Sequence, residues 1–176
     1  MTEKIRGFEV VSTYKEQDVQ LPTRATKHSA GYDFYASKEI IVPSMIKQIL
    51  SSFKNGETKA EQSSQKEDAI TSVLVPTGVK AYMPAGEYLL LANRSSNPIK
   101  NQLALPNGVG IIDGDYYGNE SNDGEIFFQL INYGLEDRVI QKGDRIGQGI
   151  FMPYMRADNE EEPLSSRMGG FGSSGR

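Results

Sequence analysis

Short runs rich in β-branched and aromatic residues recur along this chain, separated by Gly, Pro, Asn and Asp. Such runs are too short for ordinary helices and are typical of strands. Pro43, Pro76 and Pro84 fall at the ends of runs, where a missing N–H costs least. The runs cover residues 7–12, 32–36, 39–42, 72–75, 79–83, 87–92, 109–112, 126–132, 138–140 and 146–153. This spacing predicts an all-β protein, folded as a sandwich or a barrel.

Two segments depart from the strand pattern. Apolar residues of 45–50, together with Phe53, recur at helical spacing, and residues 55–68 are polar. We therefore expect residues 44–69 to form a short amphipathic helix and a mobile loop inserted between two strands. Such an insertion is usually a tolerated surface segment; the alternative is a lobe that binds a partner protein, for which the sequence offers no motif. Residues 95–102 are predicted to form a second short helix.

The composition narrows the possible functions. The 176 residues suit a single domain with a sizeable core. The net charge of −4 argues against broad binding to nucleic acid or to an anionic membrane. The chain has no cysteine and only one histidine, His28. This composition excludes a thiolate nucleophile, a cysteine-based zinc site and a histidine cluster. It has no long apolar run and no signal peptide, so we expect a soluble, cytoplasmic protein.

Residues 110–118, Gly-Ile-Ile-Asp-Gly-Asp-Tyr-Tyr-Gly, are the strongest candidate for a functional site. They place two carboxylates, Asp113 and Asp115, and an aromatic ring in what we expect to be a tight, glycine-bounded hairpin. The second candidate is the Gly- and Ser-rich segment 167–175, which has no apolar periodicity but carries amides and hydroxyls that can wrap a phosphate chain. We expect the two segments to act together.

Three further segments carry weaker signals. In residues 30–33, Ala-Gly-Tyr-Asp, an aspartate beside a glycine is usually a turn former. Residues 94–98, Arg-Ser-Ser-Asn-Pro, combine a guanidinium and two hydroxyls with a helix start, which suits either phosphate binding or a plain N-cap. Residues 143–148, Gly-Asp-Arg-Ile-Gly-Gln, are predicted as a turn into a buried strand, with Gln148 as the only hint of a ligand.

Within these segments, residues 30–33, 94–96, 110–118, 143–148 and 170–175 resemble, in this order, the five motifs of the trimeric dUTPase family. The resemblance includes residues 21–26 and 75–79 and covers nearly the whole chain outside 44–69. It implies a jelly-roll β domain over residues 1–163, with the insertion at 44–69, and a flexible C-terminal arm over residues 164–176 that completes the active site. It also implies a homotrimer with three active sites, each assembled from motifs of different subunits.

The resemblance further implies hydrolysis of dUTP to dUMP and pyrophosphate, with Mg²⁺ bound to the triphosphate. This reaction keeps uracil out of DNA and supplies dUMP for dTMP synthesis. By position, Asp113 corresponds to the family's base, which activates the water that attacks the α-phosphorus, and Asp33 meets the metal through water. A rigidly held carboxylate suits such chemistry because phosphoryl transfer depends mainly on positioning and charge neutralisation. The residues that would hold the phosphates are Arg94, Ser95, Ser96 and Gln148.

Base and sugar selection follow from the same resemblance. The backbone of Gly110, Ile111 and Ile112, with the Asn107 side chain, would match the edge of uracil, whereas cytosine reverses donor and acceptor. Tyr116 would pack beneath the deoxyribose, although on its own it is interpreted as a core aromatic. In the arm, Phe171 would cover the base, and Gly172, Ser173 and Ser174 would wrap the γ-phosphate. The spacing from Arg167 to Phe171 is one residue shorter than in the family, which leaves the contact of Arg167 with that phosphate open.

Two alternative functions compete with this one. The dCTP deaminase branch shares the fold, the trimer and an Arg-Ser-Ser motif, but it uses a glutamate on the strand after the third motif. The corresponding residue here is Gln129, which cannot shuttle a proton. The other alternative is a nucleotide-sensing regulatory protein on the same fold, and the intact Asp113 argues against that loss of catalysis.

Overall fold

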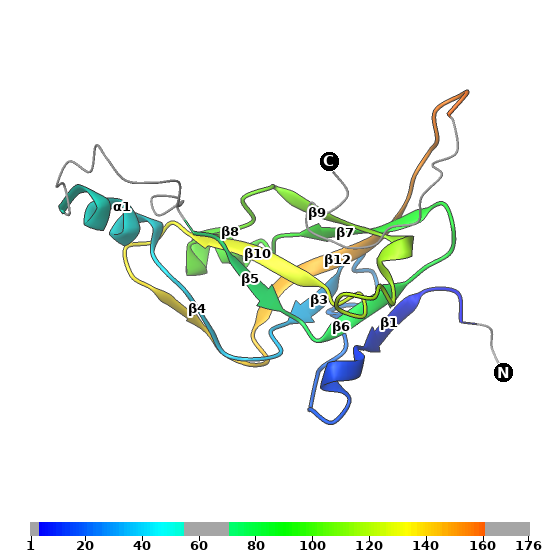
Figure 1. Cartoon of the computed structure of the whole chain (residues 1–176), viewed down its shortest axis with the longest axis horizontal. Coiled ribbons are helices and arrows are strands. Elements are labelled where there is room, and N and C mark those ends of the chain that lie inside the picture. Colours follow the sequence, from blue (N-terminus) through cyan, green and yellow to red (C-terminus); the bar gives the residue numbers. More distant parts are fainter. Residues whose placement is uncertain (1–3, 55–70, 161–176) are drawn as a thin grey trace.

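The computed structural model describes residues 4–54 and 71–160, and strands dominate both ranges (Figure 1). The strands are β1 (Gly7–Val10), β2 (Thr23–Arg24), β3 (Tyr32–Tyr35), β4 (Ile40–Val42), β5 (Val73–Pro76), β6 (Val79–Tyr82), β7 (Glu87–Ala92), β8 (Leu103–Ala104), β9 (Val109–Asp113), β10 (Phe127–Asn132), β11 (Arg138–Ile140) and β12 (Arg145–Pro153). The helical elements are the 3₁₀ turns η1 (Ser12–Tyr14) and η3 (Gly114–Tyr116), the helix α1 (Met45–Lys54) and the π-helical turn η2 (Asn97–Asn101).

The largest sheet runs in the order β2-β3-β12-β7-β9, and all of its neighbouring strands are antiparallel. A second sheet runs β5-β10-β8, while β1 pairs with β6 and β4 with β11. Burial alternates along β7 and along β10, as expected for strands with one face toward a core. The core holds residues from both larger sheets, and the rings of Phe34 on β3 and Phe128 on β10 lie 5.4 Å apart.

A glycine on β12 permits this close packing. A Cβ atom added to Gly147 would lie 1.9 Å from the Phe128 ring, a distance that no side chain can occupy. The aromatic ring of one sheet therefore packs directly on the backbone of the other. Gly147 lies one residue before Gln148, so the same packing fixes the backbone that carries a predicted site residue.

All ten runs predicted as strands contain a strand. Two strands were missed, β2 and β8, each two residues long. The predicted strand 7–12 is too long, because the chain turns into η1 where the Ser12 N–H donates to the Asp123 carboxylate at 2.8 Å. The predicted hairpin at 110–118 is wrong: β9 pairs with β7, and β10 joins the second sheet.

The two predicted helices are both present. The segment 95–102 holds a single π-helical turn, η2. Helix α1 begins after Ser44 and lies at the opposite end of the molecule from β1 (Figure 1). Ser44, predicted as the first residue of the insertion, is fully buried, and its Oγ donates to the Gly134 carbonyl at 2.5 Å. These contacts make it part of the β domain. The predicted loop 55–68 lies outside the described residues.

Two apolar side chains of α1 face solvent. Phe53 is 78% exposed and Leu50 is 55% exposed. Nothing in the described part of the chain identifies a partner for this face. Within residues 4–54 and 71–160, no helix is both long and apolar enough to cross a membrane.

Candidate functional site

Asp33 is the centre of a charged cluster on the largest sheet. It lies on β3, directly opposite Gln148 on β12. Its Oδ1 accepts a hydrogen bond from Arg94 Nε at 3.0 Å, and its Oδ2 accepts one from Arg145 Nη1 at 3.3 Å. The Asp33 side chain is only 13% exposed, so this carboxylate is held between two guanidinium groups near the surface.

The segment after β7 is fastened to the same cluster. Arg94 Nη1 donates to Ser96 Oγ at 3.3 Å, and Gln148 Nε2 donates to the Asn93 carbonyl at 3.1 Å. Gly31 lies beneath Gln148, because a Cβ there would fall 2.3 Å from the glutamine Oε1. The structure therefore brings together the first, second and fourth predicted motifs. Ser95 is exposed beside them.

Asn97 is a supporting residue that sequence reasoning missed. It is 1% exposed, and its Nδ2 donates to the Asn93 side-chain oxygen at 2.8 Å and to the Ile146 carbonyl at 2.9 Å. These bonds hold the Arg-Ser-Ser segment against β12. The only available signal was an asparagine directly after the two serines, which is also a common residue in turns.

A pocket of about 260 Å³ beside this cluster is lined by three arginines, Arg94, Arg138 and Arg145. Only Arg94 was predicted. Arg138 lies on β11 and donates to the Asn101 side chain at 2.6 Å. Guanidinium groups bind phosphate and carboxylate oxygens well, so the cluster with Asp33, Arg94, Ser96 and Gln148 suits an anionic ligand.

The third motif is formed by β9 and η3 on the edge of the same sheet. Gly110 lies against Leu91, where an added Cβ would be 3.2 Å from the leucine Cβ. Ile112 is partly buried, whereas Asn107, Ile111 and Asp113 are exposed. The segment is also tied to β1, because the Tyr117 hydroxyl donates to Glu9 at 2.6 Å. This bond, followed by burial and the nearby carboxylates, raises the pKa of Tyr117 to about 12.

Tyr116 is buried, with 4% of its surface exposed. Its hydroxyl donates to the Glu125 carbonyl at 3.0 Å and accepts from Asn122 Nδ2 at 2.8 Å. These contacts agree with the interpretation of Tyr116 as a core aromatic. Its contact with a sugar stays a prediction.

Asp113 does not join the cluster around Asp33 within one chain. One row across the sheet joins Asp33 to Gln148, Ala92 and Val109, and Asp113 lies four residues further along β9. At roughly 3.3 Å per residue and about 4.8 Å per strand, the two carboxylates are about 13 Å apart along the strands and about 14 Å apart across them. No single small group can contact both. The predicted arm residues Arg167, Phe171, Gly172, Ser173 and Ser174 lie outside the described residues.

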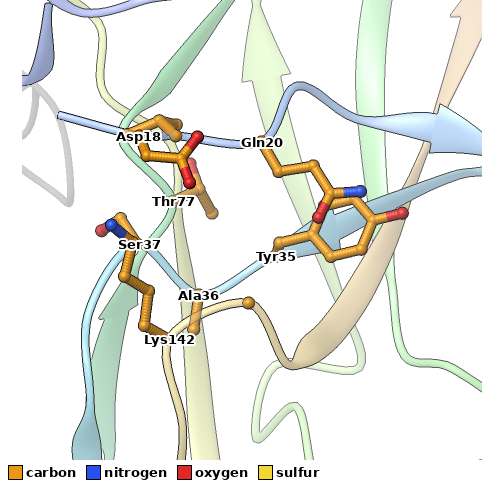
Figure 2. Close-up of a pocket in the computed structure, with 9 residues that line it drawn as sticks. Asp18, Gln20, Tyr35, Ala36, Ser37, Thr77 and Lys142 are labelled. Carbon is orange, nitrogen blue, oxygen red and sulfur yellow. The ribbon is translucent and has the colours of Figure 1, made fainter.

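A larger pocket, of about 490 Å³, lies at the end of β3 (Figure 2). Its lining includes Thr77 and Gly143 from the segments that carry the family resemblance, but none of the residues predicted individually to bind substrate or metal. Figure 2 shows Gln20 beside Tyr35 on one side and Lys142 near Ser37 on the other. The buried hydroxyls in its wall, on Ser37 and Thr77, already donate to backbone carbonyls at 3.1 and 2.6 Å. These two hydroxyls thus serve the fold.

The residues described contain no group of three or more metal-binding side chains. Asp33 is the carboxylate that pairs with Arg94 and Arg145, and Asp144 also lines the pocket with the three arginines. Each of its oxygens accepts one guanidinium hydrogen bond, and a carboxylate can accept about four. Mg²⁺ usually keeps several waters and binds through one or two carboxylates together with substrate phosphates. The donor set around Asp33 fits such a contact through water.

Fold and site together define an all-β, jelly-roll protein with an arginine-rich cluster that suits an anionic ligand. Residues 59–175 match the dUTPase family model. The deoxyuridine 5′-triphosphate nucleotidohydrolase of Lactococcus lactis is 46% identical over 173 residues, which span 98% of this chain and 99% of that protein. The dUTPase of Streptococcus mutans matches with a TM-score of 0.69 and 40% identity, over 86% of this chain and 98% of that one. The chain therefore belongs to the dUTPase family, which confirms the predicted family and fold class.

A more distant match is a mutant of the dUTPase from phage phi11 of S. aureus, whose structure is described as revealing the coordination of a structural Mg(II) ion. Its TM-score is 0.61 at 16% identity, over 89% of this chain and 95% of that one. At this identity the match shows the fold alone.

Proposed function

We propose that this protein hydrolyses dUTP to dUMP and pyrophosphate. The observation that carries the proposal is the cluster of Asp33, Arg94, Ser96 and Gln148, assembled in a chain that is 46% identical, over nearly its whole length, to a deoxyuridine 5′-triphosphate nucleotidohydrolase. The cellular result would be removal of dUTP as a precursor of uracil in DNA, and a supply of dUMP for dTMP synthesis.

In this proposal the cluster binds the triphosphate. Arg94 supplies charge and directed N–H donors, while Ser95, Ser96 and Gln148 add hydrogen bonds. Asp33 orients Arg94 through the 3.0 Å bond to Nε, and Ser96 Oγ accepts from Nη1 at 3.3 Å. Nη2 and the second N–H of Nη1 would then meet phosphate oxygens. Mg²⁺, bound with the triphosphate near Asp33, would neutralise phosphate charge.

Asp113 serves as the general base. It ends β9, where the pairing of β9 with β7 fixes its backbone, and its side chain is exposed to water. A carboxylate held in this way can orient a water molecule and accept its proton. The exposed edge of the Gly110–Ile112 backbone and the Asn107 side chain would bind uracil, and Tyr116 would pack against the deoxyribose.

A homotrimer would bring these parts together. The separation of Asp113 from Asp33 within one chain supports a site that takes its third motif from another copy. The C-terminal arm, residues 164–176, would then close over the bound nucleotide with Phe171 on the base. Arg167, Gly172, Ser173 and Ser174 would meet the γ-phosphate and exclude water from the site.

The direct test is to incubate the protein with dUTP, dCTP, dTTP and UTP in Mg²⁺ and to resolve the products. We expect dUMP and pyrophosphate from dUTP and far slower turnover of the other three. Release of dUDP and phosphate, or no turnover of dUTP, would contradict the proposal.

Deamination of dCTP is disfavoured by the position of Gln129. This residue lies on β10, and its Nε2 donates to Ser72 Oγ at 2.6 Å. An amide held in that way cannot carry a proton to or from a base. Ammonia release from dCTP in the same assay would overturn this reasoning, and tight binding of dUTP without turnover would favour a nucleotide sensor.

A further inference from the structure

The loop 119–124 folds back over Tyr116. Asn119 Nδ2 donates to the Tyr116 carbonyl at 3.1 Å, and its backbone N–H also points to that oxygen at 3.4 Å. Gly124 closes the loop with a φ of +81°, and a Cβ there would lie 2.6 Å from the Tyr116 carbonyl oxygen. Only glycine allows both the conformation and this approach. The loop is thus built against the tyrosine.

Asn122 places a donor on the hydroxyl of that tyrosine. Its Nδ2 lies 2.8 Å from Tyr116 Oη, which in turn donates to the Glu125 carbonyl at 3.0 Å. The orientation of the amide is fixed, because Asn122 Oδ1 accepts from Asn119 Nδ2 at 2.8 Å and from the Gly124 N–H at 3.1 Å. The far end of the Tyr116 ring is therefore held by one donor and one acceptor.

The next residue anchors the loop to the rest of the domain. Asp123 accepts from Lys80 Nζ at 2.7 Å and from the Ser12 N–H at 2.8 Å, and the bond to Lys80 contributes most to lowering the pKa of this carboxyl. Asp123 has a positive φ of +59°, a conformation that non-glycine residues rarely adopt. These contacts fix the position from which Asn122 reaches the tyrosine.

We propose that Asn122 is a positioning residue that sets the Tyr116 ring and, through it, the selection of deoxyribose over ribose. The proposal rests on the function proposed above, in which this ring packs beneath the sugar. Ribose is larger than deoxyribose only by the oxygen of its 2′-hydroxyl, so a modest tilt of the Tyr116 ring decides whether ribose fits. The Asn122 tether opposes that tilt, and such supporting hydrogen bonds commonly determine the accuracy of a site.

The test compares kcat/KM for dUTP and for UTP in three variants. Asn122→Leu keeps nearly the same size but has no polar atom to bond to the Tyr116 hydroxyl, and Asn122→Ala removes the whole contact. Ser121→Ala is the matched control, because Ser121 bonds to Asn119 and not to the tyrosine. We expect the preference for dUTP over UTP to fall roughly tenfold in both Asn122 variants, the effect of about one hydrogen bond. The kcat for dUTP should stay within about threefold of wild type, and the control should keep the full preference.

A double-mutant cycle separates positioning from general stability. In a Tyr116→Phe background the tether is already lost, so Asn122→Ala should not change the preference further. An unchanged preference in folded Asn122→Leu or Asn122→Ala, or equal losses for both nucleotides, would overturn the inference while leaving dUTP hydrolysis intact. If neither Asn122 variant folds, Tyr116→Phe removes the same bond from its other end, and an unchanged preference there would overturn the inference. Wild-type protein that does not hydrolyse dUTP would instead refute the proposed function.

Discussion

The separation of Asp113 from Arg94 predicts how two inactive variants behave when they are combined. Asp113 lies opposite Tyr88 at one end of β7, whereas Arg94 follows Ala92 beyond its other end. Six residues of nearly extended chain separate Tyr88 from Arg94, about 20 Å at roughly 3.3 Å each. A site that uses both side chains must therefore take them from different copies of the chain. Asp113→Asn and Arg94→Ala should each be inactive alone and should complement each other in mixed trimers.

The size of the effect follows from counting sites. In trimers formed from equal amounts of the two variants, a site has an intact arginine about half the time and an intact aspartate about half the time. Sites that draw on two subunits are then complete in about one quarter of cases, so we expect about 25% of wild-type activity. Sites within one subunit would never be complete. In a mixture of wild type with the double variant, we expect about one quarter of wild-type activity if sites are shared between subunits. Sites within one subunit would instead give about one half.

The assay is to unfold the two variants together, refold them, confirm with two different affinity tags that mixed trimers form, and measure pyrophosphate release from dUTP in the unfractionated mixture. Each variant refolded alone is the baseline, and wild type treated in the same way sets the full scale. Mixed trimers that stay at the baseline, together with half activity in the mixture of wild type and double variant, would refute the shared site.

Four other outcomes are expected. Asp113→Asn should keep dUTP binding but lose about a hundredfold to ten-thousandfold in kcat, because an amide cannot accept the proton; turnover within tenfold of wild type would remove Asp113 as the base. Replacing residues 45–69 with a short turn should leave dUTP kinetics and the trimer intact, since loop-closure entropy changes by only about 0.6 kcal/mol per doubling of length; a trimer without activity would show that the insertion reaches a site. Deleting residues 167–176 should keep the melting temperature and the trimer on a sizing column but severely impair hydrolysis, and full activity would refute a role for the arm. Burial raises the pKa of Glu125, so its ionisation lowers the stability of the folded protein as pH rises above the unfolded value near 4.5. Glu125→Gln keeps an acceptor for the Gly78 N–H, and its melting temperature should rise relative to that of wild type between pH 4 and pH 8. A difference in melting temperature that does not change with pH would contradict this.

The sequence by itself determined the elements and the family. Alternating burial along β7 and β10 arises from the two-residue repeat of a strand, so their apolar pattern was visible without any partner. The repeat of a helix is also a local pattern, so the spacing of the apolar residues in 45–50 was enough to identify α1. The motif residues Asp33, Arg94 and Gln148 could be selected because the family spacing appears in order along the chain.

Only the tertiary structure decided which strands pair and which side chains meet. The segment 110–118 has the local features of a hairpin, but the partner of β9 is β7, which comes earlier in the chain, and no local pattern encodes that choice. Asn97, Arg145 and Asn122 look like ordinary turn or surface residues in the sequence. They matter through bonds to Ile146, Asp33 and Tyr116, and two of these three partners lie far away along the chain. Periodicity is a property of neighbouring residues, whereas a contact depends on packing across the whole fold, and that packing also leaves Asp113 on the far edge of the sheet from Asp33.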